Sequence, residues 1–429
     1  MKNTHIHPLR AARMNLPRPL TQQQLADFVE VSASTIERAE RGEPISIDSI
    51  QRICKHLEKD AKELGLIKES SEKQDDVELS NTPQPLKYLT MGPEQLIQRY
   101  ISEKDKLLEL TIDGIEWTIP EVVVFDNSKQ HLPITSIAVQ QDQSCQEYRI
   151  PTRIEGKAND ILEEIGHYFY DSTTIRLNGI QINTSGITLL VTKAHFLQYI
   201  ATNYAMDALL KEKGWTRSLR DTVHPSTHLC RLEESLLANH IGVGALVFTA
   251  DNYLLLPMRS KENIATWQQT ISPSISGATS YDDDLFSKRE GPVSSWIREG
   301  REELGMSNSD FTEGSDIFLG ITRDLLRGGK PEMFFATRLN ITKAQLEQKF
   351  KKARDRWENK ELRWLEFTYT LTPLVTEQER AIFLQEFLSL LNLYHNQLSR
   401  TAQVNFTLWF KYMWSAYKEV VRLSPLVLS

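Results

Sequence analysis

One stretch that begins at Arg298 carries the residues in this chain that are best suited to chemistry. On a helix, Glu299, Glu302 and Glu303 are three and four residues apart, so their carboxylates share one face. Like charges at this spacing repel, and a divalent cation such as Mg²⁺ removes the repulsion because it binds a few carboxylates together with water and phosphate oxygens. The stretch therefore predicts a metal site. The alternative is a solvated helix on which Arg298 and Arg301 partly neutralise the glutamates.

The order R-E-x-x-E-E-x-G followed by an apolar residue resembles the Nudix box, whose pattern is G-x5-E-x7-R-E-U-x-E-E-x-G-U, with U aliphatic. Glu290 falls at the spacing of the upstream glutamate. Gly300 departs from the first aliphatic position, and Asp284 occupies the position of the leading glycine. The nearest glycine, Gly277, would imply an insertion between it and the helix. The residues that match the core of the box are Arg298, Glu299, Glu302, Glu303, Gly305 and Met306.

The resemblance implies an Mg²⁺-dependent (or Mn²⁺-dependent) hydrolase that acts on a nucleoside diphosphate linked to another group. It makes Glu302 and Glu303 metal ligands, and Glu299 either a ligand or the general base. Arg298 would orient a glutamate through a bidentate pair. Glu290 and Gly277 are candidates for the metal-binding loop. Four basic residues are candidates for phosphate binding, with ordinary surface positions as the alternative: Arg259, Arg323, Arg327 and Lys330.

The elements that would position this helix occupy residues 236–370, for which the resemblance implies an α/β/α sandwich. Apolar runs predict strands at 241–250, 253–259 and 267–274 before the helix at 293–304. Further strands are expected at 317–320 and 333–337, on either side of a loop at 323–330. A helix at 343–356 and a strand at 363–367 complete the unit.

The first 66 residues read as short helices. Thr21 is a good N-cap for a helix at 22–28, with Gln24 at the capping-box position, and Ser32 caps a second helix at 33–41. A third apolar pattern covers 45–57. Two short helices joined by a tight turn are typical of a helix-turn-helix.

The pieces L-T-Q-x-x-L-A from Leu20 and S-x-S-T-I-x-R-x-E-R-G from Ser32 resemble the Cro and lambda-repressor class of helix-turn-helix. The resemblance implies binding to double-stranded DNA, with Gln22 and Arg38 on phosphates. It places Ala33, Ser34 and Glu37 toward the major groove, while Thr35 could face either the groove or the core. The alternative is a helix-turn-helix used for protein contacts, because residues 1–66 hold ten Lys and Arg against nine Asp and Glu.

The predicted fold class is a multidomain α+β chain. Residues 67–86 are polar and predict a flexible linker, and 87–235 predict a middle α/β domain of unknown role, including an amphipathic helix at 194–213. In the middle region, His224, His228 and Cys230 are interpreted as surface loop residues rather than zinc ligands, because Pro225 interrupts the helix that would align them. Residues 371–429 predict C-terminal helices that either pack as ordinary core or form a dimer surface.

Composition limits the class of protein. The net charge of -7 gives no general attraction to nucleic acid, so DNA contact requires a local patch. Three widely spaced cysteines fit a reducing cytoplasm, and neither a signal peptide nor a membrane span is expected. The first hypothesis is a homodimeric DNA-binding regulator whose Nudix-like domain binds, and hydrolyses, a nucleotide. Two alternatives stay open: primarily a Nudix pyrophosphohydrolase with an autoregulatory helix-turn-helix, and a non-enzymatic sensor or assembly protein.

Overall fold

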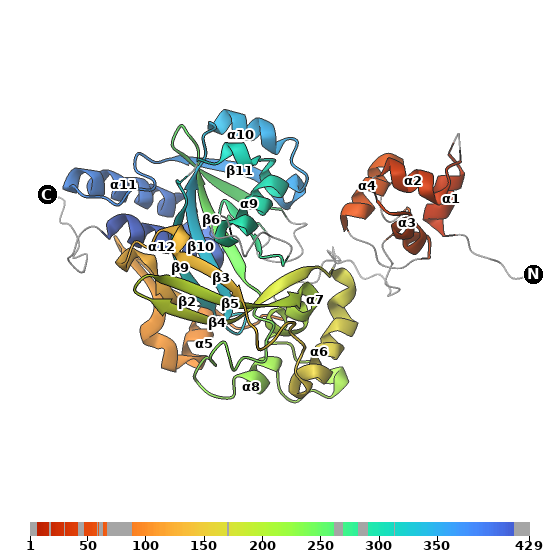
Figure 1. Ribbon diagram of the computed structural model, residues 1–429, viewed down its shortest axis with the longest axis horizontal. Helices are drawn as coiled ribbons and strands as arrows, with labels where there is room; N and C mark the ends of the chain where they lie inside the picture. The colour runs from red at the N-terminus through yellow and green to blue at the C-terminus, as the bar shows by residue number, and fades with distance from the viewer. Residues whose placement is uncertain are drawn as a thin grey trace, which may run out of the picture. The chain divides into compact units, whose positions relative to one another are not determined.

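The computed structural model describes residues 7–16, 19–29, 31–41, 47–57, 59, 63–66, 88–169, 171–260, 269–281, 291–312 and 314–415. The chain divides into two compact units (Figure 1). The first unit is Met1–Asn81 with Glu163–Asp171, and the second is Thr82–Leu162 with Ser172–Ser429.

The described residues in the N-terminal part of the first unit form helices α1 (Pro8–Met14), α2 (Gln22–Phe28), α3 (Ala33–Glu40) and α4 (Ile47–Leu57). Thr21 and Gln24 form the predicted capping box of α2, and the Ser32 hydroxyl accepts a hydrogen bond from the backbone N–H of Thr35. The apolar residues of these helices meet in one small core, which includes Leu9, Leu25, Ile36, Ile53 and Leu57.

The second unit is built on a mixed eight-stranded sheet. Strands β6 and β10 pair in parallel at its centre, and the other pairs are antiparallel. Strand β8 (Ile275–Ala278) pairs with β6 beside the main path. Along that path the order is β1 (Leu107–Ile112), β2 (Ile115–Asp126), β9 (Ile317–Asp324), β10 (Lys330–Arg338), β6 (Gly242–Phe248), β7 (Tyr253–Arg259) and β11 (Asn359–Glu366).

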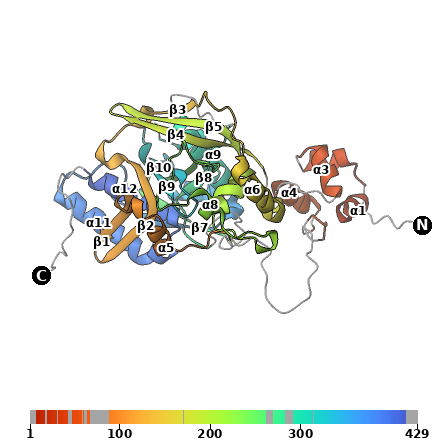
Figure 2. The same cartoon turned by 90° about the horizontal axis from the view of Figure 1, so that it is seen from below.

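A smaller sheet of three strands lies against the same core as helix α9 (Gly291–Leu304). Figure 2 shows it as a separate layer along one edge of the unit. Its order is β3 (Ile137–Gln141), β5 (Gly186–His195) and β4 (Thr173–Asn183). The remaining helices of the middle region are α5 (Pro93–Arg99), α6 (Thr152–Ile165), α7 (Phe196–Tyr199) and α8 (Leu219–Val223).

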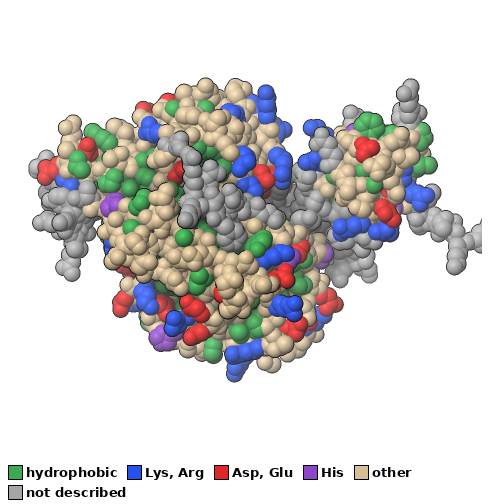
Figure 3. Space-filling view, in the orientation of Figure 1, with side chains coloured by type: hydrophobic (Ala, Val, Ile, Leu, Met, Phe, Trp, Pro, Cys, Tyr) green, Lys and Arg blue, Asp and Glu red, His purple; other side chains and the backbone are tan. Residues whose placement is uncertain are grey.

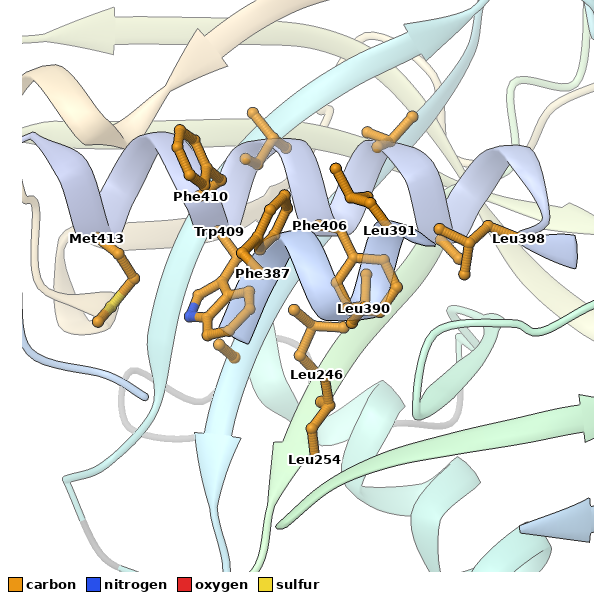
Figure 4. Packing of buried hydrophobic residues seen from close by; sticks show 14 of the residues in the cluster. Leu246, Leu254, Phe387, Leu390, Leu391, Leu398, Phe406, Trp409, Phe410 and Met413 are labelled. Carbon is orange, nitrogen blue, oxygen red and sulfur yellow. The ribbon is translucent and has the colours of Figure 1, made fainter. Parts of the chain in front are cut away.

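Successive side chains of a strand point to opposite faces of the sheet, and in the large sheet apolar side chains are buried on both faces. Helices therefore cover both faces. Val243 and Ala245 pack on the face covered by α9 and α10 (Lys343–Phe350). Leu246 and Leu254 pack on the opposite face, against α11 (Glu377–Tyr394) and α12 (Arg400–Trp414) (Figure 4). The predicted C-terminal helices are therefore core of this unit, with Trp409 fully buried.

The first two strands of the expected middle region also belong to the large sheet, since β2 pairs with β9. The predicted boundary at 235/236, between a middle domain and a Nudix-like domain, stays a prediction. In the contact pattern both segments belong to one unit.

Three local expectations were wrong. The helix expected at 194–213 is replaced by the end of β5, the short α7 and a π-helical turn, Ile200–Tyr204. Residues 199–208 are all buried, and Asn203 bonds to Asn239 and to the Arg327 carbonyl. The strand expected at 267–274 forms instead as β8, while 261–268 lie outside the described residues. The helix expected at 343–356 ends at Phe350.

No helix in the described part of the chain is long and apolar enough to cross a membrane.

Candidate functional site

Helix α9 holds the predicted carboxylates at the surface of the large sheet. Trp296 and Leu304 anchor the helix in the core that it shares with both sheets. Glu299 and Glu303 therefore turn inward, with side chains 15% and 4% exposed, while Glu302 is 27% exposed. The two inner carboxylates thus lose most of their hydration, which is costly unless positive charge lies near.

Arg298 supplies part of that charge from the same helix. Its Nη1 lies 3.0 Å from Glu299 Oε1 and 3.2 Å from Glu302 Oε2, and its Nη2 donates to the Ala278 carbonyl at 2.7 Å. Arg354 also reaches Glu302, at 3.4 Å. The predicted role of Arg298 in orienting a glutamate is compatible with this geometry, in which Nη1 lies between Glu299 and Glu302.

Arg259, at the end of β7, is the second positive group in the site. Its Nη1 lies 2.6 Å from Glu358 Oε2 and 3.6 Å from Glu303 Oε1, and its Nη2 donates to Ser276 Oγ at 2.6 Å. The structure brings it here because β7 pairs with β11, which places Asn359 opposite Arg259. Asn359 Nδ2 lies 3.5 Å from Glu303 Oε2.

Sequence reasoning missed Glu358. It lies more than fifty residues from α9, and no local spacing connects it to the glutamates there. The strand predicted at 363–367 begins too late to include it, because the observed β11 already begins at Asn359. Its carboxylate is the fourth in the site and shares Arg259 with Glu303.

Burial changes the proton affinity of these carboxylates. Loss of hydration raises the pKa of Glu299 to about 7, the Arg298 guanidinium opposes this shift, and the charges of Glu358 and Glu302 add to it. Burial also raises the pKa of Glu303 well above its ordinary value, with Arg259 opposing and Glu358 adding. A group that titrates near neutral pH can exchange a proton with a reacting water.

The donors in this site are of the kind that Mg²⁺ or Mn²⁺ prefers, since all four are carboxylates. Within the described residues, however, no group of three His, Cys, Asp or Glu side chains is arranged to hold a metal ion. The guanidinium groups of Arg259 and Arg298 supply the positive charge. The residues therefore fit a hard cation in kind, and a bound cation would compete with these arginines. Glu290, the other predicted candidate, lies outside the described residues.

The two glycines that complicated the motif have close neighbours. A Cβ on Gly277 would lie 2.1 Å from Glu299 Oε1, so a side chain there would displace the carboxylate. A Cβ on Gly300 would lie 2.5 Å from Met306 Cε and 2.9 Å from Ile275 Cδ1. Glycine at the aliphatic position of the motif thus allows α9 to pack closely on β8.

The other three predicted phosphate-binding residues are not brought to the carboxylates of α9. They lie at the β9–β10 hairpin, where Arg323 and Lys330 are in strands rather than in the expected loop. All three are buried in the wall of the fold. Arg323 Nη1 donates to the Cys230 carbonyl at 2.7 Å, Arg327 Nε lies 2.7 Å from Asp324 Oδ2, and Lys330 Nζ lies 2.9 Å from Glu332 Oε1.

One of the three residues interpreted as surface loop positions is also buried. His224 is 1% exposed and its Nε2 lies 3.2 Å from the Gly328 carbonyl. Burial lowers the pKa of His224 to about 3, with the charge of Arg220 adding to the shift. The expectation was wrong for His224 because it follows α8 directly into the core.

The helix-turn-helix places its predicted DNA-reading residues along one helix. Ser34, Glu37 and Arg38 on α3 are exposed, while Ala33 and Thr35 are half-buried. Glu37 forms an exposed ion pair with Arg41 at 2.8 Å. These assignments stay predictions, because the structure holds no DNA.

A buried ion pair that the sequence did not reveal fixes α1 against α3. Arg13 Nε lies 2.6 Å from Glu40 Oε1, and both side chains are almost fully buried. Glu40 Oε2 also accepts a hydrogen bond from Gln22 Nε2 at 2.7 Å. Gln22, predicted to contact phosphate, is thus held at the start of α2 by the same carboxylate.

Comparison with known proteins finds a family match for the N-terminal part of the chain. A helix-turn-helix family model matches residues 9–64. No curated protein matches the chain. Among solved structures, the crystal structure of DR0079 from Deinococcus radiodurans matches with 14% identity and a TM-score of 0.21, over 30% of this chain and 67% of its own. The family match and the capped α2–α3 pair agree: residues 9–64 form a helix-turn-helix domain of the type predicted from the sequence, and this supports DNA binding.

Proposed function

We propose that the protein is a DNA-binding transcriptional regulator whose second unit binds and hydrolyses a nucleoside diphosphate-linked metabolite. The match of residues 9–64 to the helix-turn-helix family carries the first half of the proposal. The carboxylate site on α9 carries the second half.

For DNA binding, α3 enters the major groove and presents Ser34 and Glu37 to base edges. Gln22 and Arg38 contact phosphates, which position the domain without reading sequence. The near balance of charge in residues 1–66 gives weak binding by one domain. A homodimer that presents two copies of α3 to adjacent half-sites would supply the missing affinity.

The DNA proposal is tested by selecting bound sequences from a random pool and measuring affinity by fluorescence anisotropy. Arg38→Gln should weaken binding to all sequences and reduce the slope of log K against log salt by about 1. Ser34→Ala should change sequence preference instead. If the wild-type protein selects no sequence, the domain serves protein contacts.

For hydrolysis, Glu302 and Glu303 would hold Mg²⁺, with Glu299 and Glu358 close by. A bound Mg²⁺ supplies Lewis acidity toward the diphosphate and lowers the pKa of the attacking water. Glu299 accepts the proton of that water, because its pKa of about 7 suits a general base at neutral pH. Arg298 would keep Glu299 and Glu302 in place, and Arg259 would bind a phosphate oxygen in exchange for Glu303.

The hydrolysis proposal is tested by incubating the purified protein and Mg²⁺ with a panel of nucleoside diphosphate compounds. Glu302→Gln/Glu303→Gln should abolish turnover. Undiminished turnover by this variant would remove the α9 site from the reaction.

A second candidate is a sensor that binds the same compounds without hydrolysing them. The observation that favours it is the pairing of every carboxylate in the site with an arginine or an amide. Thermal stabilisation by one panel member, without turnover, would support the sensor. If wild type turns over a compound, Glu303→Gln separates the two roles, since loss of turnover with an intact DNA response would show that sensing does not need catalysis.

A further inference from the structure

A cavity of about 560 Å³ lies in the second unit, between α6 and the segment that leads into α8. Its volume is within the range of small-molecule sites. None of the residues lining it belongs to the carboxylate site on α9. Lys and Arg side chains are interspersed with Asp and Glu on this part of the surface (Figure 3), where Figure 1 shows α6 and α8.

Three basic side chains line this α6–α8 cavity: Arg153, Lys157 and Arg217. Arg153 Nη2 donates to the Thr222 carbonyl at 3.3 Å, and Lys157 Nζ donates to the Arg217 carbonyl. Carbonyl oxygens satisfy these donors but do not cancel their charge. Lys157 Nζ also lies 4.3 Å from the centre of the Trp215 ring, which holds the ammonium at the wall.

The two acidic residues in the lining are already engaged. Asp160 Oδ2 accepts a hydrogen bond from Trp215 Nε1 at 2.8 Å. Asp221 Oδ1 lies 3.0 Å from Arg99 Nη2, which approaches from outside the cavity lining, and Asp221 Oδ2 accepts from Ser218 at 3.0 Å. With Asp221 paired to Arg99, three cations in the lining face one remaining carboxylate, so the cavity is positively charged.

Gly156 lines the α6–α8 cavity from the α6 side. It lies in the interior of α6, where glycine costs about 1 kcal/mol relative to alanine. A Cβ at this position would meet nothing within 4 Å, so packing does not require glycine here. Its effect is to leave the cavity wall without a side chain.

We propose that the α6–α8 cavity binds the phosphate groups of a small phosphorylated metabolite, as a site separate from the α9 carboxylates. The planar forks of Arg153 and Arg217 match phosphate oxygens in pairs, and Lys157 adds a point charge. The open wall at Gly156 admits the rest of the ligand.

The test is calorimetric titration of the full-length protein with inorganic pyrophosphate, in EDTA so that no divalent cation takes part. Wild type should bind, and Arg153→Gln/Arg217→Gln should weaken binding at least tenfold. Arg231→Gln is the matched control, because Arg231 is an exposed arginine of the same unit that does not line the cavity. It should bind as wild type does.

A second pair of variants separates cavity blockage from unfolding. Gly156→Ala should raise the melting temperature and keep binding, since it adds only a methyl group. Gly156→Leu should fold with at least wild-type melting temperature and lose binding, because its side chain projects into the cavity. Absence of binding by wild type, or equal binding by Arg153→Gln/Arg217→Gln and Gly156→Leu, would overturn the proposal.

Discussion

Replacing Arg259 with glutamine removes the positive charge that lies between Glu303 and Glu358. The side chains of Arg259 and Glu303 are 8% and 4% exposed, so water cannot replace the lost charge. Removing one partner of a buried ion pair costs about 3–5 kcal/mol, and the partial exposure of Glu358 places this case near the lower end. We therefore expect Arg259→Gln to lower stability by about 3 kcal/mol without metal.

If α9 binds a divalent cation, Mg²⁺ should recover much of that loss. The cation and the guanidinium serve the same carboxylates, so removing Arg259 removes a competitor. At a Mg²⁺ concentration about a hundred times its Kd, binding adds about 2.7 kcal/mol. The variant should thus be stabilised more strongly by Mg²⁺ than wild type.

The assay is thermal denaturation of both proteins, with EDTA and with increasing Mg²⁺. Arg363→Gln is the matched control, because Arg363 lies on β11 in a more exposed pair with Glu361 at 2.6 Å. It should lose no more than about 1 kcal/mol and show the wild-type response to Mg²⁺. An Arg259→Gln protein as stable as wild type in EDTA would refute the role of the guanidinium. A loss that Mg²⁺ does not reduce would refute the cation site.

Three further predictions concern stability. The pKa of His224 is about 3 in the folded protein, below the unfolded value of about 6.5, so on acidification the unfolded chain takes up the proton first. As pH falls from about 6 toward 4, the free energy of unfolding of wild type should therefore fall by about 1.4 kcal/mol per pH unit more than that of His224→Gln. Urea denaturation at each pH measures both values. Gly300→Ala should keep a melting temperature close to that of wild type, because shifting the terminal carbons of Met306 and Ile275 costs about 1 kcal/mol, which is as much as the helix gains; a loss of about 3 kcal/mol or more would contradict this. Arg13→Met should destabilise the helix-turn-helix by about 3 kcal/mol and speed amide exchange in α3, and unchanged exchange would show that the Arg13–Glu40 pair is dispensable.

Local patterns in the sequence predicted local structure well. The capping residues Thr21 and Ser32 located α2 and α3, and the apolar run at 253–259 has the bounds of β7. These elements are determined by hydrogen bonds and periodicity within a few residues. The prediction of one amphipathic helix at 194–213 was wrong for the opposite reason: residues 199–208 are buried without a break, so the segment has no single buried face.

The spacing of residues along the chain could not predict contacts between segments that are far apart in the sequence. Glu303 was predicted from its own helix, but its partner Arg259 comes from β7, and Glu358 comes from the residue that precedes β11. Strand pairing brings them together, and pairing depends on the whole sheet. Arg323 and Lys330 were predicted to lie in a loop, but they lie in β9 and β10. The residue type alone does not distinguish a basic residue in a strand from one in a loop.

The most direct measurement for the proposed function is product release from the nucleoside diphosphate panel with Mg²⁺, comparing wild type with Glu302→Gln/Glu303→Gln. The proposal predicts that wild type hydrolyses at least one compound and that the double variant hydrolyses none at the same protein concentration. Equal hydrolysis by both proteins, or neither hydrolysis nor thermal stabilisation of wild type by any compound, would contradict it.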